Sequence, residues 1–157
     1  MKLLFKQRLF SWLDSYAIYD ENGTAVFTVQ GKLSWGHRLE IYDHSGAYLG
    51  QIKEEVFSFL PRFALYIGDT CVGQIKKEFT LFKPLFTLDC NDWQVSGNWL
   101  EWDYEVTNSA NQVIMTASKE VLSWTDTYVL DIPEPQNALL CLMIVLAIDA
   151  AKCSAGD

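Results

Sequence analysis

The stretch LLCLMIVLAIDAA, residues 139–151, decides the fold of this chain. Twelve of its thirteen residues are apolar, and Asp149 is the exception. Leu, Ala and Met favour helix and neither Gly nor Pro interrupts the run, so a helix is predicted over about residues 136–152. A helix that is apolar on nearly all sides is either buried all round or embedded in lipid.

Burial inside the protein is the favoured alternative. About fourteen helical residues cover only about 21 Å, whereas a bilayer crossing needs roughly 20 residues. A tail anchor normally carries a basic flank, and here only Lys152 follows the run. The sequence therefore predicts no transmembrane span, while peripheral contact with a membrane stays open as an alternative.

The chain before the helix contains an internal repeat of about 23 residues. In each copy, two apolar residues stand two positions apart, which is typical of one face of a β-strand. The copies are FSWLDSYAIYDENG (10–23), LSWGHRLEIYDHSG (33–46), FSFLPRFALYIGD (57–69), TLFKPLFTLDCND (80–92), NWLEWDYEVTNSAN (98–111) and LSWTDTYVLDIPE (122–134).

The second residue of each apolar pair is predicted to face the core and to contact the helix. Its neighbours Tyr19, Tyr42 and Tyr66 are predicted to face outward, because a shift of one residue exchanges the two faces of a strand. The predicted core residues are Ile18, Ile41, Leu65, Leu88, Val106 and Leu130.

Turn-forming residues follow each of the first five copies, and each turn leads into a second strand. These turns favour hairpins and contain Asn22-Gly23, Ser45-Gly46, Gly68-Asp69, Asn91-Asp92 and Ser109-Ala110-Asn111. Six first strands, five second strands and the N-terminal KLLFKQRL give twelve strands over about residues 2–132.

A barrel of twelve strands is wider than its own side chains fill, and a helix about 10 Å across has the shape to fill it. We therefore predict a mainly-β fold, a closed twelve-stranded barrel wrapped around a central apolar C-terminal α-helix. The whole chain, 1–157, forms one domain in this prediction.

The opening FSWLDSYAIYDENG, the recurrent QIKKEFT and FSF joints and the terminal LLCLMIVLAID resemble the LURP-one-related proteins, in particular the small bacterial-type members. That family belongs to the tubby-like superfamily, with tubby C-terminal domains and phospholipid scramblases. The resemblance covers residues 1–151 and implies the same barrel around a central helix.

The resemblance also implies a candidate site for an anionic ligand. Tubby domains bind phosphoinositides through basic residues that include a Lys-x-Arg pair on a strand, and Lys6 and Arg8 in KQR (6–8) have that form. Scramblases are linked to calcium, but the segment before the helix, DIPEPQN, offers only Asp131 and Glu134. No metal site is therefore assigned.

Composition excludes several classes of function. The net charge of -8 argues against nucleic acid as a partner, because phosphate contacts need a basic surface. The four cysteines form no CxxC pair, so no metal or redox motif is predicted. Lys6, Gln7 and Arg8 interrupt the N-terminal apolar run, so no secretory signal is predicted either. We expect a cytoplasmic protein with reduced thiols, without a cofactor.

No catalytic residues are assigned, because GxSxG, HExxH and glycine-rich phosphate loops are absent from the sequence. The expected function is that of a non-enzymatic binding or interaction module with an unidentified protein or lipid partner. A lipid-handling protein, which binds phosphoinositides or other anionic lipids or acts like a scramblase, is the alternative. An enzyme with an unrecognised site is the third reading.

Two further residue classes bear on that choice. Lysines recur near the ends of second strands and are expected to gather on one rim, as a positive patch or as solubilising rim charges: Lys32, Lys53, Lys76, Lys77 and Lys119.

Trp12, Trp35 and Trp124 share a repeat column with Phe59, and most of this column is expected to pack at the barrel end. Exposed members would mark a partner or membrane surface.

Overall fold

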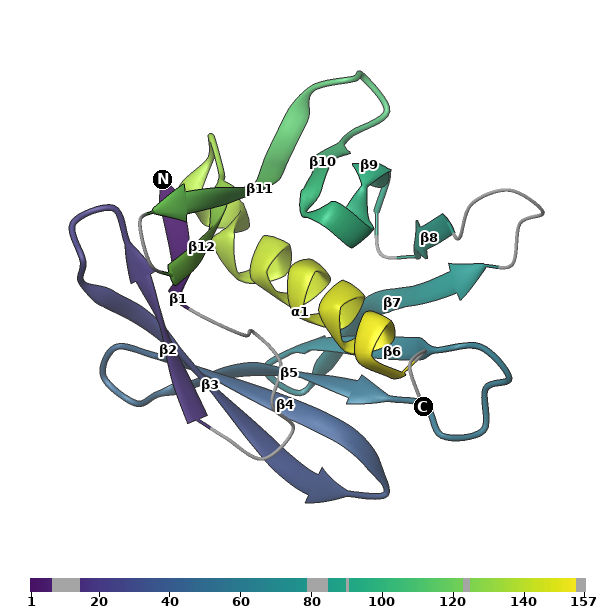
Figure 1. Ribbon diagram of the computed structural model, residues 1–157. Helices are drawn as coiled ribbons and strands as arrows, with labels where there is room; N and C mark the ends of the chain where they lie inside the picture. The colour runs from purple at the N-terminus through teal and green to yellow at the C-terminus, as the bar shows by residue number, and fades with distance from the viewer. Residues whose placement is uncertain (7–14, 79–84, 90, 123–124, 155–157) are drawn as a thin grey trace.

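In the computed structural model, strands surround one helix (Figure 1). The structure describes residues 1–157 except 7–14, 79–84, 90, 123–124 and 155–157. The strands are β1 (Lys2–Lys6), β2 (Ser15–Asp20), β3 (Ala25–Ser34), β4 (Gly36–Asp43), β5 (Tyr48–Glu54), β6 (Arg62–Ile67), β7 (Thr70–Glu78), β8 (Leu85–Leu88), β9 (Gln94–Asn98), β10 (Asp103–Thr107), β11 (Val113–Leu122) and β12 (Thr125–Asp131). The helices are the 3₁₀ turns η1 (Trp99–Glu101) and η2 (Pro135–Asn137) and the α-helix α1 (Ala138–Ser154).

All twelve strands join one antiparallel sheet, which confirms the predicted mainly-β barrel. The order is β8-β7-β6-β5-β4-β3-β2-β1-β12-β11-β10-β9, so the first strand lies between β2 and β12. Leu3 is paired with Leu130 across β1 and β12, and the amino group of Met1 donates to the carbonyl of Ile132 at 3.1 Å. The first and last strands of the chain are therefore joined to each other in the sheet.

One predicted hairpin does not form. β8 and β9 lie against each other at the two ends of the sheet, but the described residues include no hydrogen-bonded ladder between them, so the barrel is nearly closed. Phe86 and Trp99 touch across this seam, with ring centroids 4.8 Å apart. The predicted turn residue Asp92 instead accepts bonds from the Ser109 backbone N–H at 3.0 Å and hydroxyl at 2.6 Å, which ties it to the β10–β11 hairpin.

The repeat arises from one kind of turn. Asp20 and Asp43 end β2 and β4, and Asn108 directly follows β10. The Oδ1 atom of each accepts hydrogen bonds from backbone N–H groups two and four residues ahead, at 2.8–3.0 Å. A side chain that replaces a backbone acceptor in this way fixes the direction of the returning strand. The turn residues predicted from the repeat therefore close the β2–β3, β4–β5 and β10–β11 hairpins.

The predicted core column faces inward. Ile18, Ile41, Leu65, Val106 and Leu130 are fully buried, and Leu88 is half-buried against the same core, which includes the helix. Tyr19, Tyr42 and Tyr66 are half-buried and lie outside that core. The strand register read from the repeat is therefore confirmed.

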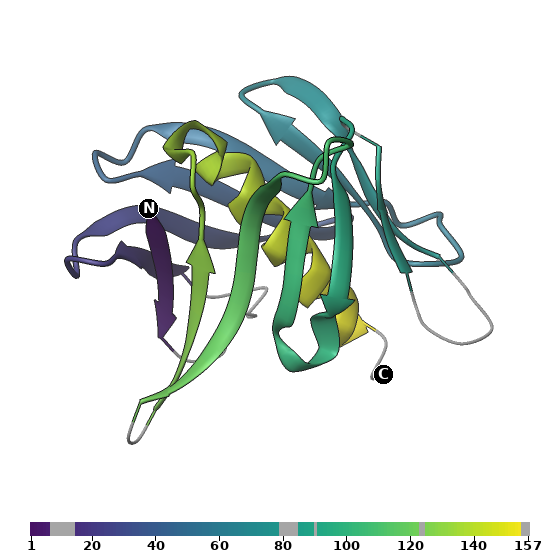
Figure 2. The same ribbon diagram turned by 90° about the horizontal axis from the view of Figure 1, so that it is seen from above.

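The helix α1 fills the barrel. It begins two residues later than predicted, because Pro135 opens a 3₁₀ turn in which the Asn137 N–H donates to the Glu134 carbonyl at 2.9 Å, and it also ends two residues later. Residues 141–148 are at most 1% exposed. Figure 2 shows α1 with β9–β11 on one side and β2–β6 on the other.

The strands approach the helix closely at Gly50 of β5. A Cβ atom on this residue would lie 2.6 Å from Met143 Cε and 2.1 Å from the Tyr66 carbonyl oxygen, closer than real contacts allow. Only glycine therefore lets β5 lie at this distance from α1 and β6.

Burial, rather than length, argues that α1 belongs inside the protein. With 17 residues, α1 is longer than the fourteen assumed from the sequence. By length and mean hydropathy (1.3), Pro135–Lys152 could cross a membrane, but 61% of this segment is buried inside the protein. The apolar surface of the helix is already covered by strands, so it needs no lipid.

Candidate binding surface

Two connections meet at one end of the barrel. Trp35 alone joins β3 to β4, and residues 55–61 join β5 to β6. Gly36, at φ +85°, leaves so little space that a Cβ atom would lie 2.6 Å from Val56 Cγ2. The Glu54 carboxylate also accepts the His37 N–H at 3.2 Å and contacts His37 Nδ1 at 2.6 Å. The two connections are therefore held as one unit.

These connections carry large apolar side chains in contact with solvent. Trp35 is 87% exposed, Val56 is 51% exposed, and Phe57 and Phe59 are both 99% exposed. Tight turns and loops normally carry polar residues, and apolar side chains gathered at one place typically mark an interaction site. We call these four residues the loop-end surface.

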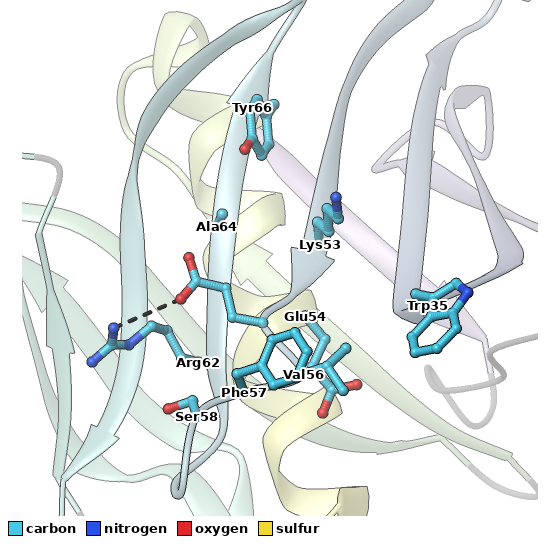
Figure 3. Close-up of a pocket in the computed structure, with 10 residues that line it drawn as sticks. Trp35, Lys53, Glu54, Val56, Phe57, Ser58, Arg62, Ala64 and Tyr66 are labelled. Carbon is cyan, nitrogen blue, oxygen red and sulfur yellow. Dashed lines mark ion pairs between the residues drawn. The ribbon is translucent and has the colours of Figure 1, made fainter.

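A hollow of about 460 Å³ adjoins the loop-end surface. Its floor is Ala64 of β6, which points outward and is nevertheless only 4% exposed. Figure 3 shows Arg62, Ala64 and Tyr66 along one strand and Lys53 on the next. The hollow exists because a small residue stands among long ones, and we call it the Ala64 pocket.

The carboxylates beside the Ala64 pocket already have donors. Glu54 is bound by His37, and Glu55 accepts from Gln74 Nε2 at 2.7 Å and lies 3.7 Å from Arg62 Nη1. Lys53 is exposed and forms no ion pair or hydrogen bond within the described residues. This lysine is therefore available to an external anion.

A row of cations crosses the outer face of three neighbouring strands. Lys32, Arg38 and Lys53 stand directly opposite one another on β3, β4 and β5. Glu40 lies 3.9 Å from Lys32 and 3.3 Å from Arg38 and balances part of this charge. Like charges directly opposite each other destabilise a sheet, so an anion bound at this row would relieve repulsion.

The lysine rim predicted from the repeat forms only in part. Lys32 and Lys53 flank Arg38, and Lys76 stands opposite Arg62, but Lys119 lies on β11 over the Tyr128 ring at 6.0 Å. The predicted rim did not include Arg38 and Arg62, because it was made only of lysines near the ends of second strands. The sequence could have indicated both, since each arginine lies near the start of the first strand of a predicted hairpin.

The candidate pair Lys6 and Arg8 is not joined to this surface. Lys6 is the last residue of β1, opposite Thr127, and β2, β3 and β4 separate its strand from β5. Arg8 lies outside the described residues. That site stays a prediction.

The tryptophan column has a different outcome from the expected one. Trp35 and Phe59 are exposed, so the prediction that they pack at the barrel end is wrong for both, while Trp12 and Trp124 lie outside the described residues. Trp99 and Trp102 do belong to the core. The two described members of the column therefore mark a surface, as predicted for its exposed members.

A second group of polar side chains is buried beside the helix. Asp149 is 9% exposed, and burial raises its pKa to about 6, against the opposing effect of Lys152. The Tyr16 and Tyr104 hydroxyls make no hydrogen bond within the described residues, and burial followed by the charge of Asp149 raises the pKa of both. We assign these groups an effect on stability, because the two hydroxyls and most of Asp149 are buried.

The remaining reactive groups point to no chemistry. Burial raises the pKa of Cys141 to about 12, so its thiol stays protonated and unreactive. Within the part of the chain that the structure describes, no three His, Cys, Asp or Glu side chains are grouped to hold a metal ion. The candidate site that the structure brings together is therefore the loop-end surface with the Ala64 pocket.

Comparisons with known proteins agree with this architecture. The family model described as LURP-one-related matches residues 1–149. The uncharacterized protein YxjI of Bacillus subtilis (strain 168) is 34% identical over 150 residues, which cover 95% of this chain and 92% of YxjI. The X-ray structure of a protein from Arabidopsis thaliana has the same fold, with a TM-score of 0.65 at 18% identity over 95% of this chain and 90% of that one. The chain therefore belongs to the LURP-one-related family.

Proposed function

We propose that this protein is a non-enzymatic binding module and that the loop-end surface is its contact region. The observation that carries the proposal is the 87–99% exposure of Trp35, Phe57 and Phe59 on two connections that are fastened together. Aromatic side chains dominate contact energies at protein interfaces, and a preformed surface loses little entropy on binding. The barrel, filled by α1, is the rigid support.

Site-specific photo-crosslinking tests this proposal. Benzoylphenylalanine in place of Phe59 is expected to give a discrete crosslinked species in the cells that produce the protein. The matched control places the same group at Leu100, which is 60% exposed on η1. Equal crosslinking at the two positions, or none at Phe59, contradicts the proposal.

A lipid-handling function is the second candidate. Fully exposed phenylalanines and a tryptophan at loop ends, beside lysines, are also a pattern that interfacial membrane binding uses. Flotation with vesicles that contain anionic lipid tests it, and the expected signature is binding that is lost at high salt. Loss of flotation in Trp35→Ser, with Leu100→Ser unaffected, would assign the membrane contact to the loop-end surface.

We also propose a cytoplasmic location and no catalytic role. Cys71 and Cys141 are free thiols, one exposed and one buried, which is compatible with a reducing compartment. Assays of the purified protein against esters and phosphoesters test the second point, and turnover that a single substitution abolishes would contradict it.

A further inference from the structure

We propose that the Ala64 pocket binds an extended segment of a partner protein in which a carboxylate stands next to a bulky apolar side chain. In this complex the carboxylate lies on Lys53, and the apolar side chain enters the hollow between Phe57 and Tyr66. The inference rests on the proposed function, because it names what the loop-end surface recognises.

The shape of the site favours an inserted side chain. Its volume of about 460 Å³ falls in the range of roughly 300–1,000 Å³ found for ligand pockets. It follows β6 from Arg62 to Tyr66, a length of about 13 Å at about 3.3 Å per residue. Four residues of an extended chain cover that length, so the site fits a short peptide segment.

The charge of the site favours a carboxylate. Glu54 and Glu55 are engaged by His37, Gln74 and Arg62, whereas Lys53 is exposed without an acidic partner among the described residues. Its two cross-strand neighbours are Arg38 and Ala64, a second cation and the pocket floor. A single anionic group on Lys53 therefore lies beside the hollow and also reduces the repulsion between Lys53 and Arg38.

The same charges disfavour a membrane as the occupant. A planar anionic surface laid on the loop end would face the carboxylates of Glu54 and Glu55 as well as Lys53 and Arg62. A single side chain meets Lys53 and avoids both glutamates. A hollow floored by alanine also offers nothing to a flat surface.

The test is selection from a displayed library of random peptides against the folded full-length protein, followed by affinity measurements on the selected peptides. The peptides are expected to share an Asp or Glu adjacent to a large apolar residue. Lys53→Glu should weaken their binding by about tenfold or more, which corresponds to about 1.4 kcal/mol. Ala64→Met, which fills the hollow from the outer face, should weaken it similarly.

Matched variants make the result specific. Lys2→Glu, an exposed lysine on β1, and Leu100→Ser, an exposed leucine on η1, should leave the affinity unchanged. A peptide with Lys in place of its acidic residue should lose affinity for the wild type and regain it with Lys53→Glu. This exchange of charges separates a direct contact from an effect on folding.

The outcomes distinguish this inference from the proposed function. Peptides that depend on Trp35 and Phe57 but bind equally to Lys53→Glu and Ala64→Met would leave the loop-end surface as the contact region and overturn the pocket assignment. Failure to enrich any peptide, or enrichment without a shared acidic residue, also overturns it. Flotation of the wild type with phosphatidylserine vesicles, lost in Lys53→Glu, would overturn it in favour of a membrane.

Discussion

Leu146 lies on the central turns of α1 and is fully buried by the strands around it. Leu146→Ala should leave a cavity and lower the free energy of unfolding by about 2–5 kcal/mol, measured by urea denaturation. Leu140→Ala, on the same helix but only half-buried, is the control and should cost less. Leu146→Lys should yield little folded protein, because a buried unpaired charge costs far more than a cavity. Equal losses at the two leucines would contradict a central helix.

Asp149 makes stability depend on pH. Burial raises its pKa from 3.8 to about 6, so between these two pH values the folded protein keeps a proton that the unfolded chain has released. The contribution of Asp149 to the free energy of unfolding is therefore greatest below pH 3.8. It falls by up to about 3 kcal/mol as the pH rises to about 6. Asp149→Asn should remove this fall and raise the free energy of unfolding at pH 7, as measured by denaturant titration at several pH values.

Asp43 provides the control for that experiment. Hydrogen bonds from Ser45 and Ala47 lower its pKa below 3.8, so its contribution is present above this value and is lost as pH falls further. Asp43→Asn should therefore lower stability with little change of slope between pH 5 and 7. A slope unchanged by Asp149→Asn would show that another group carries the pH dependence.

Among the elements, α1 provides the apolar core against which the inner faces of the strands pack. A chain that ends at Ile132 keeps all twelve strands but exposes their inner faces, and it should aggregate or stay unfolded. Size-exclusion chromatography and thermal melting measure this outcome. A soluble, monomeric and cooperatively melting chain of this length would mean that the helix is not the core.

The elements were predictable where one local pattern decides them. Apolar residues two positions apart, followed by turn residues, predicted eleven of the twelve strands, because each hairpin needs only neighbouring chain, and the N-terminal KLLFKQRL supplied the twelfth. The β8–β9 hairpin was predicted wrongly, and the bonds that Ser109 makes to Asp92 are tertiary contacts, which local sequence does not show. The start of α1 differs by two residues from the prediction, since Pro135 is compatible with either a 3₁₀ turn or a first α-helical turn.

The whole molecule should unfold as one unit. Strand residues from β1 to β12 and helix residues of α1 belong to one core, so no part buries its apolar surface alone. Circular dichroism of the strands and fluorescence of the buried Trp99 and Trp102 should give coincident urea transitions. Trp35→Phe is the control, because it removes the fluorescence of an exposed tryptophan and keeps that of the buried Trp99 and Trp102. Two separated transitions would show independent parts.

The candidate surface was less predictable than the barrel, since it depends on how whole strands are placed. The tryptophan column pointed to the right position, but sequence alone could not show that Trp35 and Phe59 turn outward. Lys53 belonged to the expected rim, whereas its isolation from carboxylates depends on bonds that His37, Gln74 and Arg62 make. The Ala64 pocket exists only because β5 and β6 are paired in one register.

Charge is distributed unevenly over the molecule. Residues 1–84 hold ten basic and nine acidic side chains, whereas residues 85–157 hold two basic and eleven acidic ones. The Ala64 pocket therefore belongs to the nearly neutral part of the chain, while the acidic part includes β9–β12. An approaching carboxylate would be repelled least on the side of the molecule where Lys53 lies.

The position of α1 after all twelve strands has a consequence for synthesis on the ribosome. Each strand leaves the exit tunnel with its apolar inner face uncovered, and the segment that covers these faces emerges last. The nascent chain therefore cannot complete its core until the helix has been translated, and until then it exposes strand edges and apolar surface. Completion of the core therefore has to wait for the helix, and the unfinished chain is the form that a holding chaperone would bind.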